Sequence, residues 1–139
     1  MSYKNIEKGK KSYKNKDLEF GFQSEDDTLF RIKEVFGADI EKTGMYDTFD
    51  FENEEYMIEL KTRRIHSKQY PDLMIGLQKL EIAETANKKC IILWKLTDGL
   101  FMWECNRDDY TVRMGGRTDR GRDERRFMAF IPMNILKKI

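Results

Sequence analysis

The sequence has a single histidine, His66, and only two cysteines, Cys90 and Cys105, which lie in separate apolar segments. This scarcity excludes a Cys/His zinc site and a histidine-based catalytic triad. We expect both cysteines to be reduced residues of the core. There is also no apolar run long enough to span a bilayer, and no apolar secretory signal segment. We therefore expect an intracellular protein, in the cytoplasm or nucleus, with no membrane partner.

The chain also lacks a strong overall charge, because 26 Lys and Arg residues nearly balance 25 Asp and Glu residues in its 139 positions. Affinity for nucleic acid would have to come from local clusters of charge. One such cluster is residues 1–17, where six lysines face only Glu7 and Asp17. We expect a basic, flexible N-terminal tail that is solvated or makes loose phosphate contacts. Residues 18–139 are enough for one domain with a single core.

The segment from Asp47 to Lys61 predicts a β-hairpin with acidic residues on its first arm. On the second arm, apolar residues alternate with Met57, Glu59 and Lys61, which is the period-two pattern of a strand with two unlike faces. Glu59 and Lys61 then point the same way, roughly 7 Å apart along the strand.

Such a pair, facing a further carboxylate, has the chemistry of a divalent cation site. Carboxylate oxygens suit Mg²⁺, which completes its shell with waters and substrate phosphate. The ion would acidify a bound water, and Lys61 could orient that water or stabilise the phosphorane. Cleavage of a phosphodiester bond would be the result. The alternative is an ordinary solvated strand face, since 37% of the chain is charged.

The length of the turn decides which aspartate faces this pair. If Asn53 and Glu54 form a two-residue turn, Asp50 shares the face of Glu59 and Lys61. A three-residue turn would bring Asp47 there instead. We expect Asp50, with Asp47 as the alternative.

A helix is expected from Ser24, a good N-cap, to about Phe36, with Gly37 as its stop. Acidic residues in the first turn suit the helix dipole. At 100° per residue, however, Glu25 falls within about 60° of the apolar stripe of this helix. We therefore expect Glu25 to point toward the core side and to need a partner, which a metal ion would provide.

The remaining elements follow from local patterns. We expect a strand over residues 38–44, a helix from Pro71 to about Asn87 and a strand from Lys89 to Leu96 that is covered on both faces. Further strands are expected at residues 100–105, 110–114 and 127–131, before a short end segment at residues 132–139. This order predicts an α/β sandwich around a mixed sheet.

Two polar, basic loops are candidates for contact with nucleic acid, because arginine binds phosphate oxygens bidentately. The alternative for both loops is a solvated surface, and we do not assign a catalytic role to the lone His66. The candidate contact residues are Arg63, Arg64 and Lys68 in the first loop, and Arg117, Arg120 and Arg122 in the second.

Glu25, Asp50, Glu59 and Lys61, on this order of elements, resemble the PD-(D/E)xK nuclease superfamily. In that superfamily a helix donates a glutamate, one strand an aspartate and the next strand Glu-x-Lys. The resemblance covers about residues 20–105. It implies a restriction-endonuclease-like α/β/α sandwich with a central mixed β-sheet. It further implies that Glu25, Asp50 and Glu59 bind the metal ion, and that Lys61 assists the attacking water.

Two junction-cutting branches of the superfamily are the most similar. Glu25-Asp26, Asp50-Phe51 and Glu59-x-Lys61 match a phage junction-resolving endonuclease, and Gln78-Lys79-Leu80 resembles archaeal Holliday junction resolvases. Phe49 stands where the superfamily motif has proline. The resemblance implies Mg²⁺ or Mn²⁺ as cofactor, DNA as partner, a homodimer, and a viral or phage gene as one origin. The other classes of function are an inactive nucleic-acid-binding or assembly module and a repair or restriction-like exonuclease.

Overall fold

The computed structural model describes residues 25–44, 47–116, 118, 121, 123 and 125–139. The expected tail at residues 1–17 and the expected N-cap Ser24 lie outside this part of the chain. In chain order the elements are α1 (Glu25–Phe36), β1 (Glu41–Lys42), β2 (Phe51–Glu52), β3 (Tyr56–Thr62), β4 (Asp72–Gly76), α2 (Leu77–Thr85), β5 (Lys89–Leu96), β6 (Gly99–Glu104), η2 (Arg107–Asp109), β7 (Thr111–Gly115), β8 (Arg126–Pro132), η3 (Met133–Ile135) and β9 (Lys137–Lys138).

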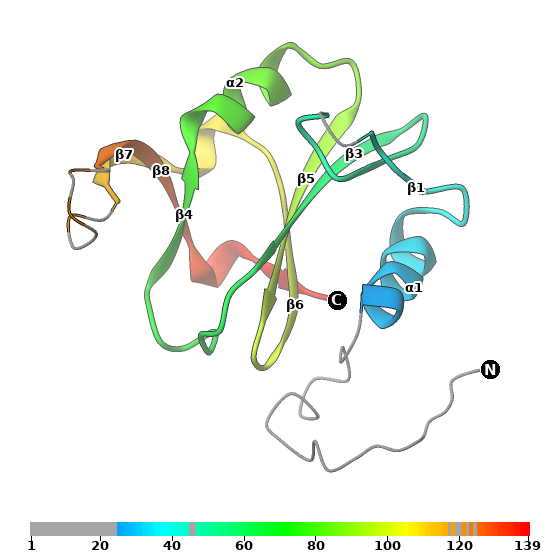
Figure 1. The fold of residues 1–139 in the computed structure, drawn as a ribbon, viewed down its shortest axis with the longest axis horizontal. Helices are drawn as coiled ribbons and strands as arrows, with labels where there is room; N and C mark the ends of the chain where they lie inside the picture. The colour runs from blue at the N-terminus through cyan, green and yellow to red at the C-terminus, as the bar shows by residue number, and fades with distance from the viewer. Residues whose placement is uncertain (1–24, 45–46, 117, 119–120, 122, 124) are drawn as a thin grey trace.

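A six-stranded mixed sheet forms the centre, in the order β1-β2-β3-β5-β6-β9 (Figure 1). β3 and β5 are parallel, and Glu59 pairs with Ile92 between them, whereas the other neighbours are antiparallel. A parallel pair needs a crossover connection, and here it contains β4 and α2. The α/β fold with a central mixed sheet is confirmed.

Each face of the large sheet carries its own apolar core. On one face, Ile58 and Leu93 pack with Ile32 and Phe36 of α1. On the other face, the Trp94 side chain packs in a second cluster, which α2 and the strands beyond it cover (Figure 1). β5 contributes to both clusters and is buried from Cys90 to Trp94, as its unbroken apolar run predicts. Glu59 and Lys61 alternate with Ile58 along β3, so they lie on the α2 face.

The second face differs from the sequence-based expectation. The helix predicted from Pro71 is wrong in its first part, because residues Asp72–Gly76 form strand β4 and α2 begins only at Leu77. Leu73 and Ile75 are buried while Met74 between them is exposed, which is the alternation of a strand. β4 pairs with β8, about 55 positions later, in a small sheet of order β4-β8-β7. Such a distant partner overrides the local helical spacing.

Elsewhere the boundaries shift by smaller amounts. The expected strand over residues 38–44 is only the two-residue β1, and residues 137–138 add the edge strand β9 to the expected end segment. α1 ends at Phe36, and Gly37 follows with φ of 136°, as expected of a helix-stopping glycine. No helix in the described part of the chain is long and apolar enough to cross a membrane.

Both cysteines are free thiols. Cys90 lies on β5 and Cys105 directly follows β6, and the Cys105 backbone N–H donates to the Cys90 carbonyl at 2.9 Å. Burial raises the pKa of the Cys105 thiol to about 12, and burial also raises the pKa of the Cys90 thiol. Both thiols are therefore protonated at neutral pH and are poor nucleophiles.

Truncation of Leu93 to alanine is expected to lower the free energy of unfolding by about 3 kcal/mol, because its side chain is fully buried at the centre of β5. Urea unfolding followed by circular dichroism measures this change. Ile135→Ala is the control, since Ile135 is 43% exposed and should change stability by less than about 1 kcal/mol. Equal effects of the two substitutions would contradict the placement of this core.

Candidate active site

The β2–β3 hairpin turns at Glu54 and Glu55. The Asn53 backbone N–H donates to the Tyr56 carbonyl at 3.1 Å, and Glu52 pairs with Met57. The turn therefore lies one residue later than expected. Its cause is the Asn53 side chain, whose Oδ1 accepts the backbone N–H groups of Glu55 and Tyr56 at 3.0 and 2.7 Å.

Asp50 leaves the regular ladder through a β-bulge. Its backbone N–H donates to the Ile58 carbonyl at 2.9 Å, although Phe51 is the register partner of Ile58. Two residues therefore oppose one, which is the pattern of a bulge. The bulge explains why Phe49 and Phe51 belong to the cores on opposite faces of the sheet. It also turns the Asp50 side chain out of the face that contains Glu59.

The Asp50 carboxylate lies at the open edge of β3, where its Oδ2 accepts the backbone N–H of Leu60 at 2.8 Å. The Leu60 nitrogen is bonded directly to the carbonyl carbon of Glu59, so Asp50 Oδ2 lies within about 5 Å of the Glu59 Cα atom. Asp50 is thus held next to the Glu59-x-Lys61 segment, although not on the same face.

Glu59 is a buried carboxylate, only 8% exposed. Its Oε1 accepts from Lys79 Nζ of α2 at 3.0 Å, and its Oε2 lies 3.6 Å from Lys61 Nζ. Two ammonium groups thus face one carboxylate in a place of low solvent access, and their contacts offset part of the cost of burying its charge. Glu59 and Lys61 are brought together as predicted.

A cavity of about 360 Å³ adjoins this cluster on the α2 face. Lys61, Lys79 and Gln78 line it, together with Thr48, Gly76 and Ile82. Polar donors from β3 and from the first turn of α2 therefore converge on a space that is open to an anionic ligand.

Glu25 does not point toward the core side, and that expectation is wrong. Its side chain is 90% exposed, and its nearest charged partner is Lys42 at 3.8 Å. The buried side chains of α1 are Thr28, Ile32 and Phe36, so Glu25 projects beyond the packed part of the helix. Angular position around a helix does not reveal where the helix overhangs the sheet.

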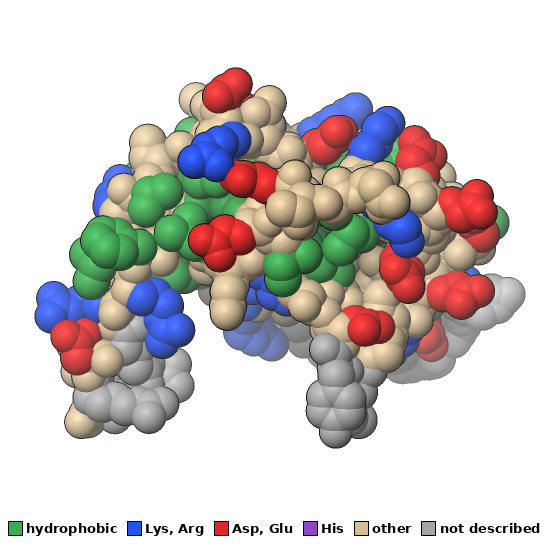
Figure 2. Space-filling view, turned by 90° about the horizontal axis from the view of Figure 1, so that it is seen from above, with side chains coloured by type: hydrophobic (Ala, Val, Ile, Leu, Met, Phe, Trp, Pro, Cys, Tyr) green, Lys and Arg blue, Asp and Glu red, His purple; other side chains and the backbone are tan. Residues whose placement is uncertain are grey.

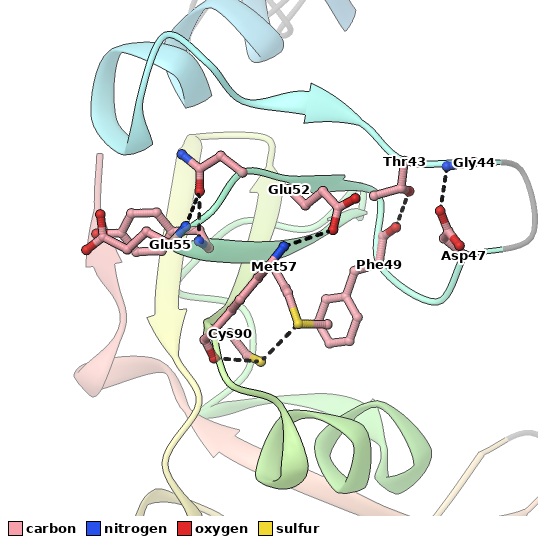
Figure 3. A network of polar contacts seen from close by, with 11 residues as sticks. Thr43, Gly44, Asp47, Phe49, Glu52, Glu55, Met57 and Cys90 are labelled. Atoms are coloured by element: carbon pink, nitrogen blue, oxygen red, sulfur yellow. Dashed lines mark hydrogen bonds and ion pairs between the residues drawn. The ribbon is translucent and has the colours of Figure 1, made fainter.

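Glu25 does border a second cavity, of about 490 Å³, on the α1 face. Asp47 and Asp50 border it too. The Asp47 carboxylate accepts the Gly44 backbone N–H at 2.6 Å, as Figure 3 shows. Asp50 lies at the open edge of β3 between this cavity and Glu59.

The donor set is the kind that a hard divalent cation uses. Among the described residues, no group of three or more His, Cys, Asp or Glu side chains is close enough together to hold a metal ion. Asp50 and Glu59 nevertheless offer two carboxylates from adjacent segments. Mg²⁺ commonly takes one or two carboxylates and fills its other positions with waters and substrate phosphate. The carboxylate oxygens of Asp50 and Glu59 therefore fit a hard divalent cation such as Mg²⁺.

Residues 15–139 match the model of a protein family described as "Phage putative PDDEXK endonuclease". The chain belongs to this family. No curated protein and no solved structure matches it. Membership of this endonuclease family confirms the PD-(D/E)xK superfamily and supports nuclease activity. It also agrees with the order of helix, hairpin and parallel β5 around the Glu59-x-Lys61 segment.

For this endonuclease family member, the structure describes only the first of the two predicted groups of nucleic-acid contacts. Arg63 and Arg64 follow β3 directly and are exposed, as is Lys68 in the same loop. The Arg63 guanidinium donates to the Thr62 carbonyl at 2.8 Å. The predicted second group, Arg117, Arg120 and Arg122, lies outside the described residues.

Lys79 is a residue of this cluster that the sequence analysis named in the Gln78-Lys79-Leu80 resemblance but gave no role in the site. An expected helix starting at Pro71 places it mid-helix on the surface, but α2 starts at Leu77 and brings Lys79 into the first turn, against Glu59. The lysine after Gln78 could have been assigned to the site only if the start of α2 at Leu77 had been known.

Proposed function

We propose that this phage endonuclease family member is a metal-dependent DNA endonuclease that prefers branched DNA, as Holliday junction resolvases do. One observation carries the proposal: the Asp50 carboxylate is fixed on the Leu60 N–H, beside the buried Glu59 and its neighbour Lys61. This arrangement resembles the Asp and Glu-x-Lys constellation of the superfamily, and it supports the proposal. The preference for branched DNA follows the sequence resemblance.

Asp50 and Glu59 are the proposed ligands of Mg²⁺ or Mn²⁺, and Glu25, across the second cavity, is proposed to bind through water. When bound, the ion would acidify the attacking water and neutralise charge on the scissile phosphate. To bind the ion, the Glu59 carboxylate must give up its contact with Lys61, with Lys79 or with both. The burial of its carboxylate strengthens its attraction to a dication.

Lys61 is proposed to orient the attacking water and to stabilise charge that develops on the phosphate. Its Nζ lies 3.6 Å from Oε2 of Glu59, the proposed metal ligand, and Lys61 also lines the 360 Å³ cavity. A cation directed at developing charge in a site of low solvent access contributes several kcal/mol to transition-state stabilisation.

The DNA backbone would be held by Arg63, Arg64 and Lys68, and by Arg117, Arg120 and Arg122.

We further propose that the protein is encoded by a phage. We also propose that it forms a homodimer. One face of the small sheet β4-β8-β7 presents exposed apolar side chains, among them Val112, Met114 and Phe127. Figure 2 shows hydrophobic side chains gathered at the end of the molecule where this sheet lies. Such a patch is typical of a protein interface. Light scattering after size exclusion measures the mass in solution.

Cleavage of a labelled four-way junction is the expected activity with Mg²⁺ or Mn²⁺, and no cleavage is expected with a chelator. Linear duplex and single strand of the same sequence serve as parallel substrates, and gel electrophoresis resolves the products. Junction cleavage that exceeds duplex cleavage by about tenfold or more would agree with recognition of branched geometry.

The pattern of products separates the other functions. Progressive loss from duplex ends would indicate an exonuclease. Junction binding without cleavage in any ion would indicate an inactive binding module. Cleavage that persists in chelator would contradict the metal-dependent mechanism.

A further inference from the structure

The ammonium group of Lys79 lies where α2, β3 and the segment before β2 meet. It is 3.0 Å from Glu59 Oε1, it donates to the Thr48 carbonyl, and it lies 5.5 Å from the centre of the Phe49 ring. These contacts come from two segments, β3 and the residues just before β2, which lie 20 and 31 positions from Lys79 in the sequence. Lys79 thus has a defined place in the site.

The charges around Glu59 do not balance. One carboxylate faces the ammonium groups of both Lys61 and Lys79. Both lysines also line the 360 Å³ cavity, with the amide of Gln78 beside them. A second anion in that cavity would complete the pairing, and a DNA phosphate has the required charge and acceptor oxygens.

We propose that Lys79 is a second lysine of the active site: it holds Glu59 while no cation is bound, and binds a DNA phosphate once a cation takes Glu59. The inference rests on the proposed function. A dication at Glu59 would repel an ammonium group 3 Å away. The flexible stem of Lys79, 26% exposed, allows the ammonium group to turn toward the cavity without leaving the site.

This exchange predicts two effects of Lys79→Met with opposite signs. Affinity for Mn²⁺ alone, measured by isothermal titration calorimetry, should rise about threefold or more, because a competing cation has been removed from Glu59. Affinity for a four-way junction in Ca²⁺, with the DNA checked to be uncut, should fall about tenfold. In chelator the same substitution should leave junction affinity unchanged, because there Lys79 remains on Glu59.

Lys88→Met is the matched control. Lys88 is 27% exposed and pairs with Glu52 at 3.2 Å, so it resembles Lys79 in burial and pairing but lies away from the cavity. It should change neither Mn²⁺ affinity nor the Ca²⁺-dependent junction affinity. Lys79→Arg keeps the charge and should restore most of the junction affinity.

A fall in Mn²⁺ affinity, or equal loss of junction affinity in chelator and Ca²⁺, would overturn the inference, since both indicate a structural role. Melting curves confirm that each variant is folded, and Lys79→Arg supplies the comparison if Lys79→Met is not. If the unmutated chain cuts no DNA in any ion, the proposed function fails. If it cuts while Lys79→Met matches it in all three titrations, only the inference fails.

Discussion

Replacement of Glu59 by glutamine is expected to reduce DNA cleavage by about a thousandfold. The amide keeps the size of the side chain but loses the negative charge that would hold the cation, and metal-assisted stabilisation of phosphate charge is worth several kcal/mol. The loss should appear in the single-turnover rate constant of cleavage, measured with saturating protein.

Stability is expected to change much less than activity in this variant. Lys61 and Lys79 lose their shared counter-charge but are partly exposed and can turn to water. Urea unfolding should show a loss of about 1–2 kcal/mol. Glu52→Gln is the matched control, because Glu52 lies on the same hairpin and binds a lysine, Lys88, at 3.2 Å. Retention of more than a tenth of the activity in Glu59→Gln would remove Glu59 from the proposed ligands.

The parts of the site that the sequence predicted are those set by local periodicity. Glu59 and Lys61 lie two residues apart on a strand, so the period of two fixes their common face without any knowledge of the rest of the fold. β5 was equally clear, because an unbroken apolar run predicts a strand that is covered on both sides. The mixed sheet around them followed from the order of elements.

The parts that it missed depend on contacts between distant segments. β4 is a strand because β8 lies beside it, and Lys79 reaches Glu59 because β4 shortens the following helix. The position of Glu25 depended on how far α1 extends past the sheet. A hydrophobic pattern gives the face of an element but not its partner.

The bulge at Asp50 illustrates a third kind of limit. The sequence-based prediction assumes an unbroken ladder of strand pairs between β2 and β3. With the turn at Glu54 and Glu55, such a ladder would still place Asp50 on the same face as Glu59. One extra residue, Asp50 itself, directly before β2 then moves the Asp50 side chain to the edge of β3. Bulges are found next to active sites because they re-aim a side chain, and here the edge position leaves the carboxylate accessible from the cavity on the α1 face.

Asp50→Asn is expected to lower cleavage by about a hundredfold or more, whereas Asp47→Asn should leave it within about threefold of the unmutated protein. Each asparagine can keep the backbone contact of the aspartate it replaces, on the Leu60 N–H or the Gly44 N–H, so neither variant should unfold the hairpin. The comparison therefore isolates the negative charge. Rates with Mg²⁺ and melting temperatures are the measurements.

The two aspartates differ in where their charge is directed. Asp50 Oδ2 accepts the N–H of Leu60, the residue after Glu59, whereas Asp47 accepts the N–H of Gly44 (Figure 3). A cation bound at Glu59 therefore has the Asp50 carboxylate beside the same strand segment, whereas the Asp47 carboxylate is bonded to Gly44. The reverse result, with Asp47→Asn inactive and Asp50→Asn active, would place the cation in the cavity on the α1 face. It would leave Glu59 with its two lysines as a structural ion cluster.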